Sequence, residues 1–154
     1  MKTFELKVYD NYHLFFHLVL TKTRRQMLNA AHKKFPECKK NEKNTAGIFY
    51  DTSYITHKEI PGKFRSNYIG TMYLNLDDIK INPEIVTHEC AHAAFSFQHF
   101  VLRYTGSFNS CINHGEFSFL GGGDSQEMFC YFLENACKKV WQETKQYKKE
   151  LKNG

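Results

Sequence analysis

The chain has 154 residues, and its 21 Lys and Arg residues against 16 Asp and Glu give a formal net charge of +5. This length supports one hydrophobic core, so we expect a single domain over residues 1–154. The apolar stretches are too short to span a membrane, and the start MKTFE lacks the apolar core of a signal peptide. We therefore expect a cytoplasmic protein with reduced cysteines. No base-reading motif accompanies the basic charge, so nucleic acid is not indicated as a partner.

The N-terminal third of the chain predicts two extended segments and a helix. Apolar residues alternate with polar ones over residues 4–8, which predicts a strand, and the run 12–20 predicts a second strand or an early helix. The segment TRRQ at residues 23–26 has the composition of a capping box. It predicts a helix that ends near Pro36, because a proline disfavours helical geometry in the residue before it.

Two further strands are predicted in the middle of the chain. The polar stretch 39–44 predicts a loop, and residues 46–54 and 68–76 predict the strands that follow it. The second of these strands places Met72 and Leu74 on one face and the residues between and after them on the other.

A histidine motif, HECAH at residues 88–92, carries most of the information about function. Asn82 can cap a helix whose first position is Pro83, so the motif falls inside that helix. Residues four apart on a helix have Cβ atoms about 5–6 Å apart, so His88 and His92 can bind one zinc ion. Glu89 then lies beside the ion as a general base. Two core histidines around a buried glutamate are the alternative, which we disfavour because an unpaired buried carboxylate is costly.

A second helix is predicted after the three glycines at residues 121–123. Asp124 or Ser125 can cap this helix, and apolar residues line one of its faces. Glu127 and Glu134 lie on another face. Either Glu127 is a metal ligand in the first turn, or the two glutamates form a solvated edge and Glu127 belongs to a capping arrangement with Asp124.

A hydrolytic zinc site has three protein ligands and one open position, so a third ligand is needed. His99 follows His92 by seven residues, which is about 10 Å along a helix and too far. We expect Glu127, because a helix holds it rigidly, to complete a site with His88 and His92. His114, in a loop that contains a glycine, is the alternative.

The segments IVTHECAHA at residues 85–93 and DSQEMFCY at residues 124–131 together resemble the small zinc metallopeptidase-like proteins of bacteriophage and prophage genomes, which are reduced relatives of the gluzincin proteases. The resemblance is specific over residues 68–140. Family members often have an acidic residue and an alanine where this chain has Gln126 and Cys130. The resemblance implies a zincin-like α+β domain, in which a small, mostly antiparallel sheet packs on the HExxH helix and on a second helix that bears the glutamate ligand.

A rival resemblance is to the SprT-like proteases. The segment HGEF at residues 114–117 is similar to the His-Gly segment that follows the two motif histidines in that family, although the match is one residue short. This resemblance implies His114 as the third ligand.

The predicted function is that of a zinc metallopeptidase or related amide hydrolase with a peptide or protein substrate, in the host cytoplasm if a phage encodes the chain. Glu89 would take a proton from water and deliver it to the leaving amine, with Tyr104, Tyr131 or His114 stabilising the oxyanion. The strand at 68–76 is the candidate for an edge strand that pairs with an extended substrate, and the alternative is an ordinary sheet strand that packs the motif helix. The alternative function is a noncatalytic zinc-containing binding protein, for example a phage factor that acts on a host partner. The oligomeric state is not predicted.

Overall fold

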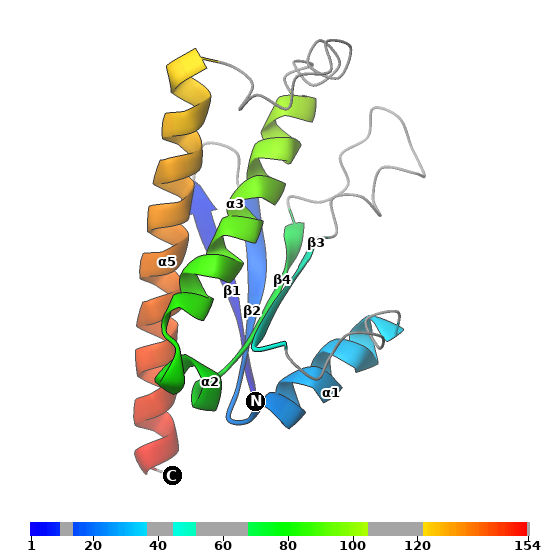
Figure 1. The fold of residues 1–154 in the computed structure, drawn as a ribbon, viewed down its shortest axis with the longest axis vertical. Coiled ribbons are helices and arrows are strands. Elements are labelled where there is room, and N and C mark those ends of the chain that lie inside the picture. Colours follow the sequence, from blue (N-terminus) through cyan, green and yellow to red (C-terminus); the bar gives the residue numbers. More distant parts are fainter. Residues whose placement is uncertain (10–13, 37–44, 52–67, 105–121, 154) are drawn as a thin grey trace.

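The computed structural model describes residues 1–9, 14–36, 45–51, 68–104 and 122–153, which form an α+β fold with one four-stranded sheet and four helices (Figure 1). The predicted α+β class is therefore confirmed. The loop predicted at 39–44 lies outside the described residues, as does the end of the strand predicted at 46–54.

The sheet has the strand order β1-β2-β4-β3 and is mixed. Its strands are β1 (Lys2–Tyr9), β2 (Leu14–Thr21), β3 (Gly47–Asp51) and β4 (Tyr68–Asn75). The β1-β2 and β3-β4 pairs are antiparallel, whereas the central β2-β4 pair is parallel. The expected mostly antiparallel sheet thus contains one parallel pair, because the chain crosses over through a helix and β3 between β2 and β4.

The two faces of the sheet pack against different helices, as side-chain alternation along the strands requires. Leu18 of β2 and Met72 and Leu74 of β4 are fully buried on the face that α3 and α5 cover. Val19 and Tyr73 point the other way and join a smaller cluster with α1. The predicted alternation of β4 is confirmed.

Helix α1 (Arg24–Lys34) begins with the predicted capping box. The Gln26 backbone N–H donates to Thr23 Oγ1 at 3.3 Å, and the Thr23 backbone N–H donates to the Gln26 side chain at 3.4 Å. Met27 and Ala31, four residues apart, are fully buried and attach the helix to the sheet. The predicted helix is therefore confirmed.

Two helices follow β4 directly. The short helix α2 (Leu76–Ile81) takes Asn75 as its N-cap, so the strand ends one residue before its predicted limit. Helix α3 (Glu84–Tyr104) carries the histidine motif. The Glu84 backbone N–H donates to Asn82 Oδ1 at 3.1 Å, which confirms the expected role of Asn82 at the start of this helix.

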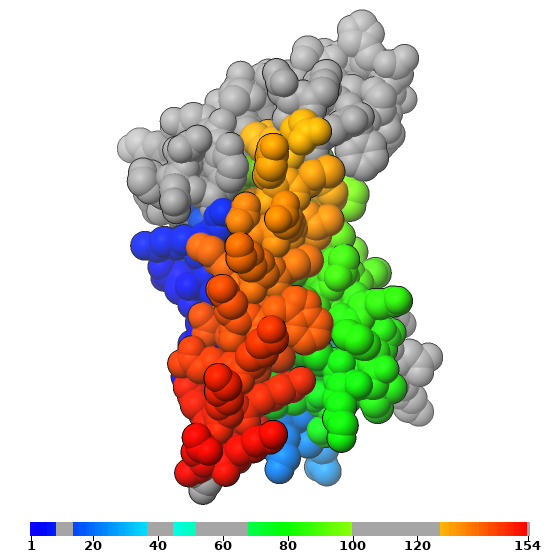
Figure 2. All heavy atoms as spheres, turned by 90° about the vertical axis from the view of Figure 1, so that its left-hand side faces the viewer, coloured from blue at the N-terminus to red at the C-terminus, as the bar shows by residue number. Residues whose placement is uncertain are grey.

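Helix α5 (Gly122–Asn153) lies between β1 and α3 (Figure 2). It begins at Gly122, earlier than predicted, so Asp124 and Ser125 lie inside its first turn and neither is the cap. Its buried face contains Phe132, Ala136 and other residues at helical spacing. Within the described ranges, no helix combines the length and the apolar character needed to cross a membrane.

A buried hydrogen-bond network around Asn75 ties β4, β3, α2 and α1 together. The Asn75 side-chain amide donates to the Ala46 carbonyl at 3.1 Å and to Asp78 Oδ2 at 2.8 Å, and its Oδ1 accepts from the Asp78 backbone N–H at 2.9 Å. The Arg24 guanidinium holds the Asp78 carboxylate at 2.7 and 2.8 Å. These hydrogen bonds, with Arg24 first, keep the pKa of Asp78 below its ordinary value. Asn75 therefore fixes where β3 begins relative to the helices.

Replacing Asn75 should cost much more stability than replacing the other asparagine cap, Asn82. Asn75→Ala removes a cap and leaves the Asp78 backbone N–H and the Ala46 carbonyl without this partner. We therefore expect a loss of about 2–4 kcal/mol in the free energy of unfolding. Asn82 is exposed, and Asn82→Ala should cost about 1 kcal/mol. Urea unfolding of both variants measures the difference. Equal losses would show that the buried network adds nothing to a simple cap.

Candidate functional site

The two motif histidines converge on the exposed side of α3. His88 Nε2 and His92 Nε2 lie 3.2 Å apart, and the rings meet edge to face with centroids 4.8 Å apart. Two nitrogen ligands of a tetrahedral zinc ion, each at about 2.0–2.1 Å, lie roughly 3.3 Å apart. The pair therefore has the spacing of two metal ligands. Burial, and secondarily the charge of His88, lowers the pKa of His92, which favours the neutral ring that binds metals.

Glu89 turns from the histidine side of α3 toward β3. Glu89 is 5% exposed, whereas His88 and His92 are both exposed, so the alternative of two core histidines around a buried glutamate does not hold. The Phe49 backbone N–H donates to the Glu89 carboxylate. Burial raises the pKa of Glu89 to about 7, and the hydrogen bond from Phe49 opposes this shift only in part. A carboxyl group with this pKa is suited to general acid–base catalysis at neutral pH.

Gly47 allows β3 to approach the Glu89 side chain closely. A Cβ atom added at Gly47 would lie 2.8 Å from Glu89 Cγ and 3.0 Å from Glu89 Oε1. It would also lie 3.0 Å from Ile85 Cγ2. Real Cβ contacts are rarely so short, so only glycine leaves room for the observed position of the carboxylate.

A cavity of about 450 Å³ opens beside these residues. His88 and Glu89 line one wall from α3, and Ala46 and Gly47 line the other from the start of β3. β3 is the outer strand of the described sheet, whereas β4 lies between β2 and β3 and is hydrogen-bonded on both sides. The expectation that β4 is the edge strand beside the motif is therefore wrong, and β3 has that position.

The opposite face of α3 is anchored to α5 by contacts that define the register of the two helices. Phe97 stacks on Phe132 with ring centroids 4.4 Å apart. The buried Cys90 thiol donates to Cys137 Sγ, and this hydrogen bond lowers the pKa of Cys137 below its ordinary value. The predicted core position of Cys90 is confirmed, and the two helices run antiparallel.

This register separates Glu127 from the histidines. Cys90 lies opposite Cys137, so His92, two residues further along α3, lies level with Asn135 on the antiparallel α5. Glu127 precedes Asn135 by eight residues, which is about 12 Å along the axis. Among the residues that the structure describes, no three His, Cys, Asp or Glu side chains are grouped closely enough to hold a metal ion.

The three candidates for oxyanion stabilisation were Tyr104, Tyr131 and His114. Tyr131 is 56% exposed on α5, and Tyr104 is the last residue of α3. His114 lies outside the described residues. Sequence reasoning missed Gly47 and Phe49, although it placed both in a strand, because strand periodicity does not indicate which helix a strand will flank.

Searches against protein-family models, curated proteins and solved structures each returned no match to this chain.

Replacing Glu89 with glutamine should stabilise the metal-free protein more at high pH than at low pH. The pKa of Glu89 rises from 4.5 in the unfolded chain to about 7 in the folded protein, so the folded state binds the proton more tightly. Stability is therefore lost as the pH rises from the lower pKa through the higher one. The glutamine side chain does not titrate, so the stability difference between Glu89→Gln and the parent should grow by about 2–3 kcal/mol between about pH 5 and about pH 8.

Denaturant unfolding of metal-free protein at both pH values measures this difference, with Glu134→Gln as a control because Glu134 is exposed on α5. An unchanged pH dependence in Glu89→Gln would contradict the burial effect.

Proposed function

We propose that this chain is a zinc-dependent metallopeptidase or a related amide hydrolase. The observation that carries the proposal is the pair of histidine Nε2 atoms 3.2 Å apart, of which His88 lines the same cavity as a buried glutamate with a pKa of about 7. His88 and His92 would supply two of the metal ligands. The reaction class is metal-assisted hydrolysis, because a carboxylate between two such ligands is placed to handle the protons of water.

Zinc bound at this site would polarise the scissile carbonyl and lower the pKa of water. Glu89 would accept a proton from that water and later donate it to the leaving amine. The Phe49 N–H holds the carboxylate from the strand side, and Gly47 leaves room for it. These two contacts fix the direction of the base relative to the histidines, so β3 acts as a support for proton transfer.

The substrate that fits this arrangement is an extended peptide. β3 pairs with β4 on one side, and its start forms a wall of the cavity that contains His88 and Glu89. A peptide that adds to the outer side of β3 would pass the histidine pair with its backbone fixed by main-chain hydrogen bonds. Recognition through the backbone would favour unfolded proteins or flexible loops over folded substrates.

The proposed third ligand is Glu127 or His114. The helix register disfavours Glu127, since it is about 12 Å along the axis from the level of His92. A ligand from outside the described residues, such as His114, would not require α5 to shift.

Zinc binding should depend on both histidines and on either Glu127 or His114, but not on both of these two candidates for the third ligand. We expect about one zinc ion per chain, with His88→Ala and His92→Ala each weakening the affinity more than about 100-fold. Chelator competition on folded Glu127→Ala and His114→Ala identifies the third ligand, because only its loss should weaken binding to a similar degree. A protein that remains metal-free after incubation with zinc would refute the proposed site.

Changes at Glu89, or at the β3 residues that hold it, should reduce the rate of hydrolysis more than they reduce zinc binding. Glu89→Gln preserves size but cannot accept the proton, so cleavage of fluorescein-labelled casein should fall by about 100-fold or more while zinc is retained. Gly47→Ala should also reduce cleavage without loss of zinc, because the new Cβ displaces the carboxylate. Ala46→Ser, at the neighbouring cavity residue, is the matched control. Equal turnover by Glu89→Gln and the parent would remove Glu89 from the mechanism.

A further inference from the structure

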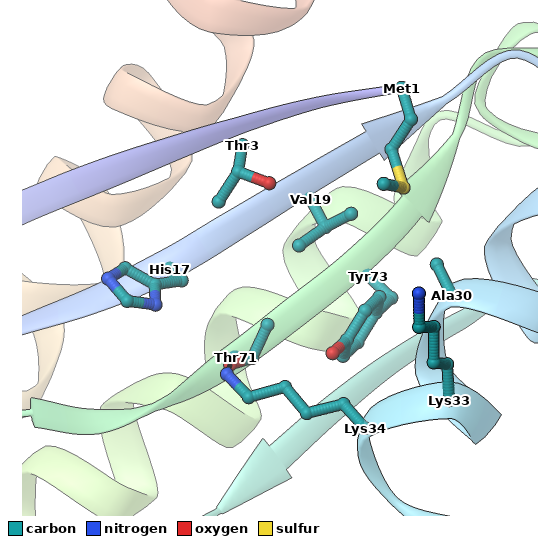
Figure 3. A pocket seen from close by; sticks show the side chains of 9 residues that line it. All are labelled: Met1, Thr3, His17, Val19, Ala30, Lys33, Lys34, Thr71 and Tyr73. Carbon is teal, nitrogen blue, oxygen red and sulfur yellow. Dashed lines mark hydrogen bonds between the residues drawn. The ribbon is translucent and has the colours of Figure 1, made fainter.

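A second cavity, of about 390 Å³, lies on the opposite face of the sheet from α3 and α5 (Figure 3). Strands β1, β2 and β4 form its base, and the second half of α1 forms a wall. Lys33 and Lys34 line it, but their ammonium groups lie on opposite sides of Tyr73. Val19 and Tyr73 are 7% and 2% exposed, so the base offers little apolar surface to a ligand. The basic lining of this cavity contrasts with that of the cavity beside the histidine motif.

The cavity beside the histidine motif has an acidic lining. Glu84 and Glu89 contribute carboxyl groups, and no lysine or arginine is among the described residues that line it. Burial raises the pKa of Glu89 to about 7, so this group carries only part of a negative charge at neutral pH. Glu84 is exposed in the first turn of α3, where the helix dipole favours a negative charge. Glu84 is therefore the main anion of this cavity, in a chain with a formal net charge of +5.

The carboxylate of Glu84 is available to a cation from outside the chain. Among the described residues, it has no salt-bridge partner. Lys80, the nearest cation along the sequence, belongs to the last turn of α2 and does not line the cavity. The Glu84 backbone N–H donates to Asn82 Oδ1 at 3.1 Å, and both residues line the cavity. This cap fixes the first turn of α3 beside the cavity.

Glu84 lies in line with the two proposed zinc ligands. Residues four apart on a helix lie one above the other, so Glu84, His88 and His92 form a row of exposed residues along α3. Neighbouring members of this row are about 6 Å apart along the helix axis. No three potential metal ligands are grouped together in the described ranges, so Glu84 does not join the two histidines at one ion. It lies one helical turn from the proposed reaction centre without being part of it.

This spacing suits the side chain of a substrate residue next to the scissile bond. Neighbouring Cα atoms of a peptide are about 3.8 Å apart. With the scissile carbonyl at the histidine pair, the long stem of a lysine or arginine in that residue can extend over the remaining distance to Glu84. An acidic side chain there would be repelled, and an uncharged one would gain no attraction between charges.

We propose that Glu84 is a specificity-determining residue of this site, which binds the side chain of a lysine or arginine next to the scissile bond of an extended peptide. The inference rests on the proposed hydrolase function and adds to it the charge of the preferred substrate. Ion pairs between exposed groups are weak, so the preference should be several-fold. It should also fall as the salt concentration rises.

Peptide binding tests this role without requiring cleavage. Short fluorescein-labelled peptides of glycine, alanine and serine, identical except for a central lysine, glutamine or glutamate, are titrated at low ionic strength. The protein is the full-length Glu89→Gln variant supplied with zinc, and fluorescence anisotropy measures the affinity. The lysine peptide should bind at least about threefold more tightly than the glutamine peptide, and the glutamate peptide should bind most weakly. No difference between the lysine and glutamine peptides would overturn the inference.

Substitutions of Glu84 in the same protein separate a direct charge contact from a structural role. Glu84→Gln should remove the preference for the lysine peptide, and Glu84→Lys should reverse it in favour of the glutamate peptide. Asp77→Asn is the matched control, because Asp77 is an exposed acidic residue in the first turn of α2 and does not line the cavity. Chelator competition should give the same zinc affinity before and after Glu84→Gln. A loss of zinc affinity, or an equal effect of Asp77→Asn on peptide binding, would overturn the role.

Cleavage distinguishes the failure of this inference from the failure of the proposed function. Mass spectrometry of casein digested by the zinc-loaded parent should find cuts next to lysine or arginine at least about threefold more often than next to uncharged polar residues. Glu84→Gln should remove this excess. Cleavage without the excess would keep the hydrolase and overturn the inference. Binding of the lysine peptide that depends on Glu84, without any cleavage, would refute the hydrolase and keep Glu84 as the residue that binds a basic side chain.

Discussion

The rotational phase of α3 is the constraint on which the rest of the site depends. Val86, Cys90 and Phe97 must face the sheet and α5, where all three are fully buried. At about 100° per residue, this choice turns His88 and His92 to the far side of the helix and leaves Glu89 between the two faces. The hydrophobic core thus decides which motif groups meet solvent and which meet β3.

The burial of Glu89 lowers the stability of the folded protein at neutral pH, although it gives this carboxyl group the pKa that suits the proposed chemistry. Removing a carboxylate from water raises its pKa and disfavours its ionised form, which weakens the folded state at neutral pH. One backbone N–H from Phe49 offsets only part of this cost. A cation at the histidine pair would favour the ionised form, so metal binding would also relieve the unfavourable burial. A pKa that burial perturbs in this way is typical of functional sites.

Helices cover the two faces of the sheet to different extents, and each cavity lies where this covering is incomplete. Helices α3 and α5 cover one face over most of its length, and the first cavity opens only where β3 begins. The shorter α1 covers part of the other face and places Lys33 and Lys34 in its last turn, where cations complement the helix dipole. Both cavities therefore lie beside the end of a helix, although they differ in chemistry.

Local patterns in the sequence determined most of the secondary structure. The alternation in β1 and β4, the capping box at Thr23 and the cap at Asn82 depend on neighbours within a few residues, so the sequence alone predicts them. The spacing of His88 and His92 likewise follows from helix geometry, and their convergence was predictable.

Only the tertiary structure decided the strand order, the parallel β2-β4 pair and the contact between β3 and Glu89. It also decided the register that sets Glu127 apart from His92. These features depend on which surfaces far apart in the chain bury each other best, and periodicity in the sequence gives a residue's face but not the partner of that face.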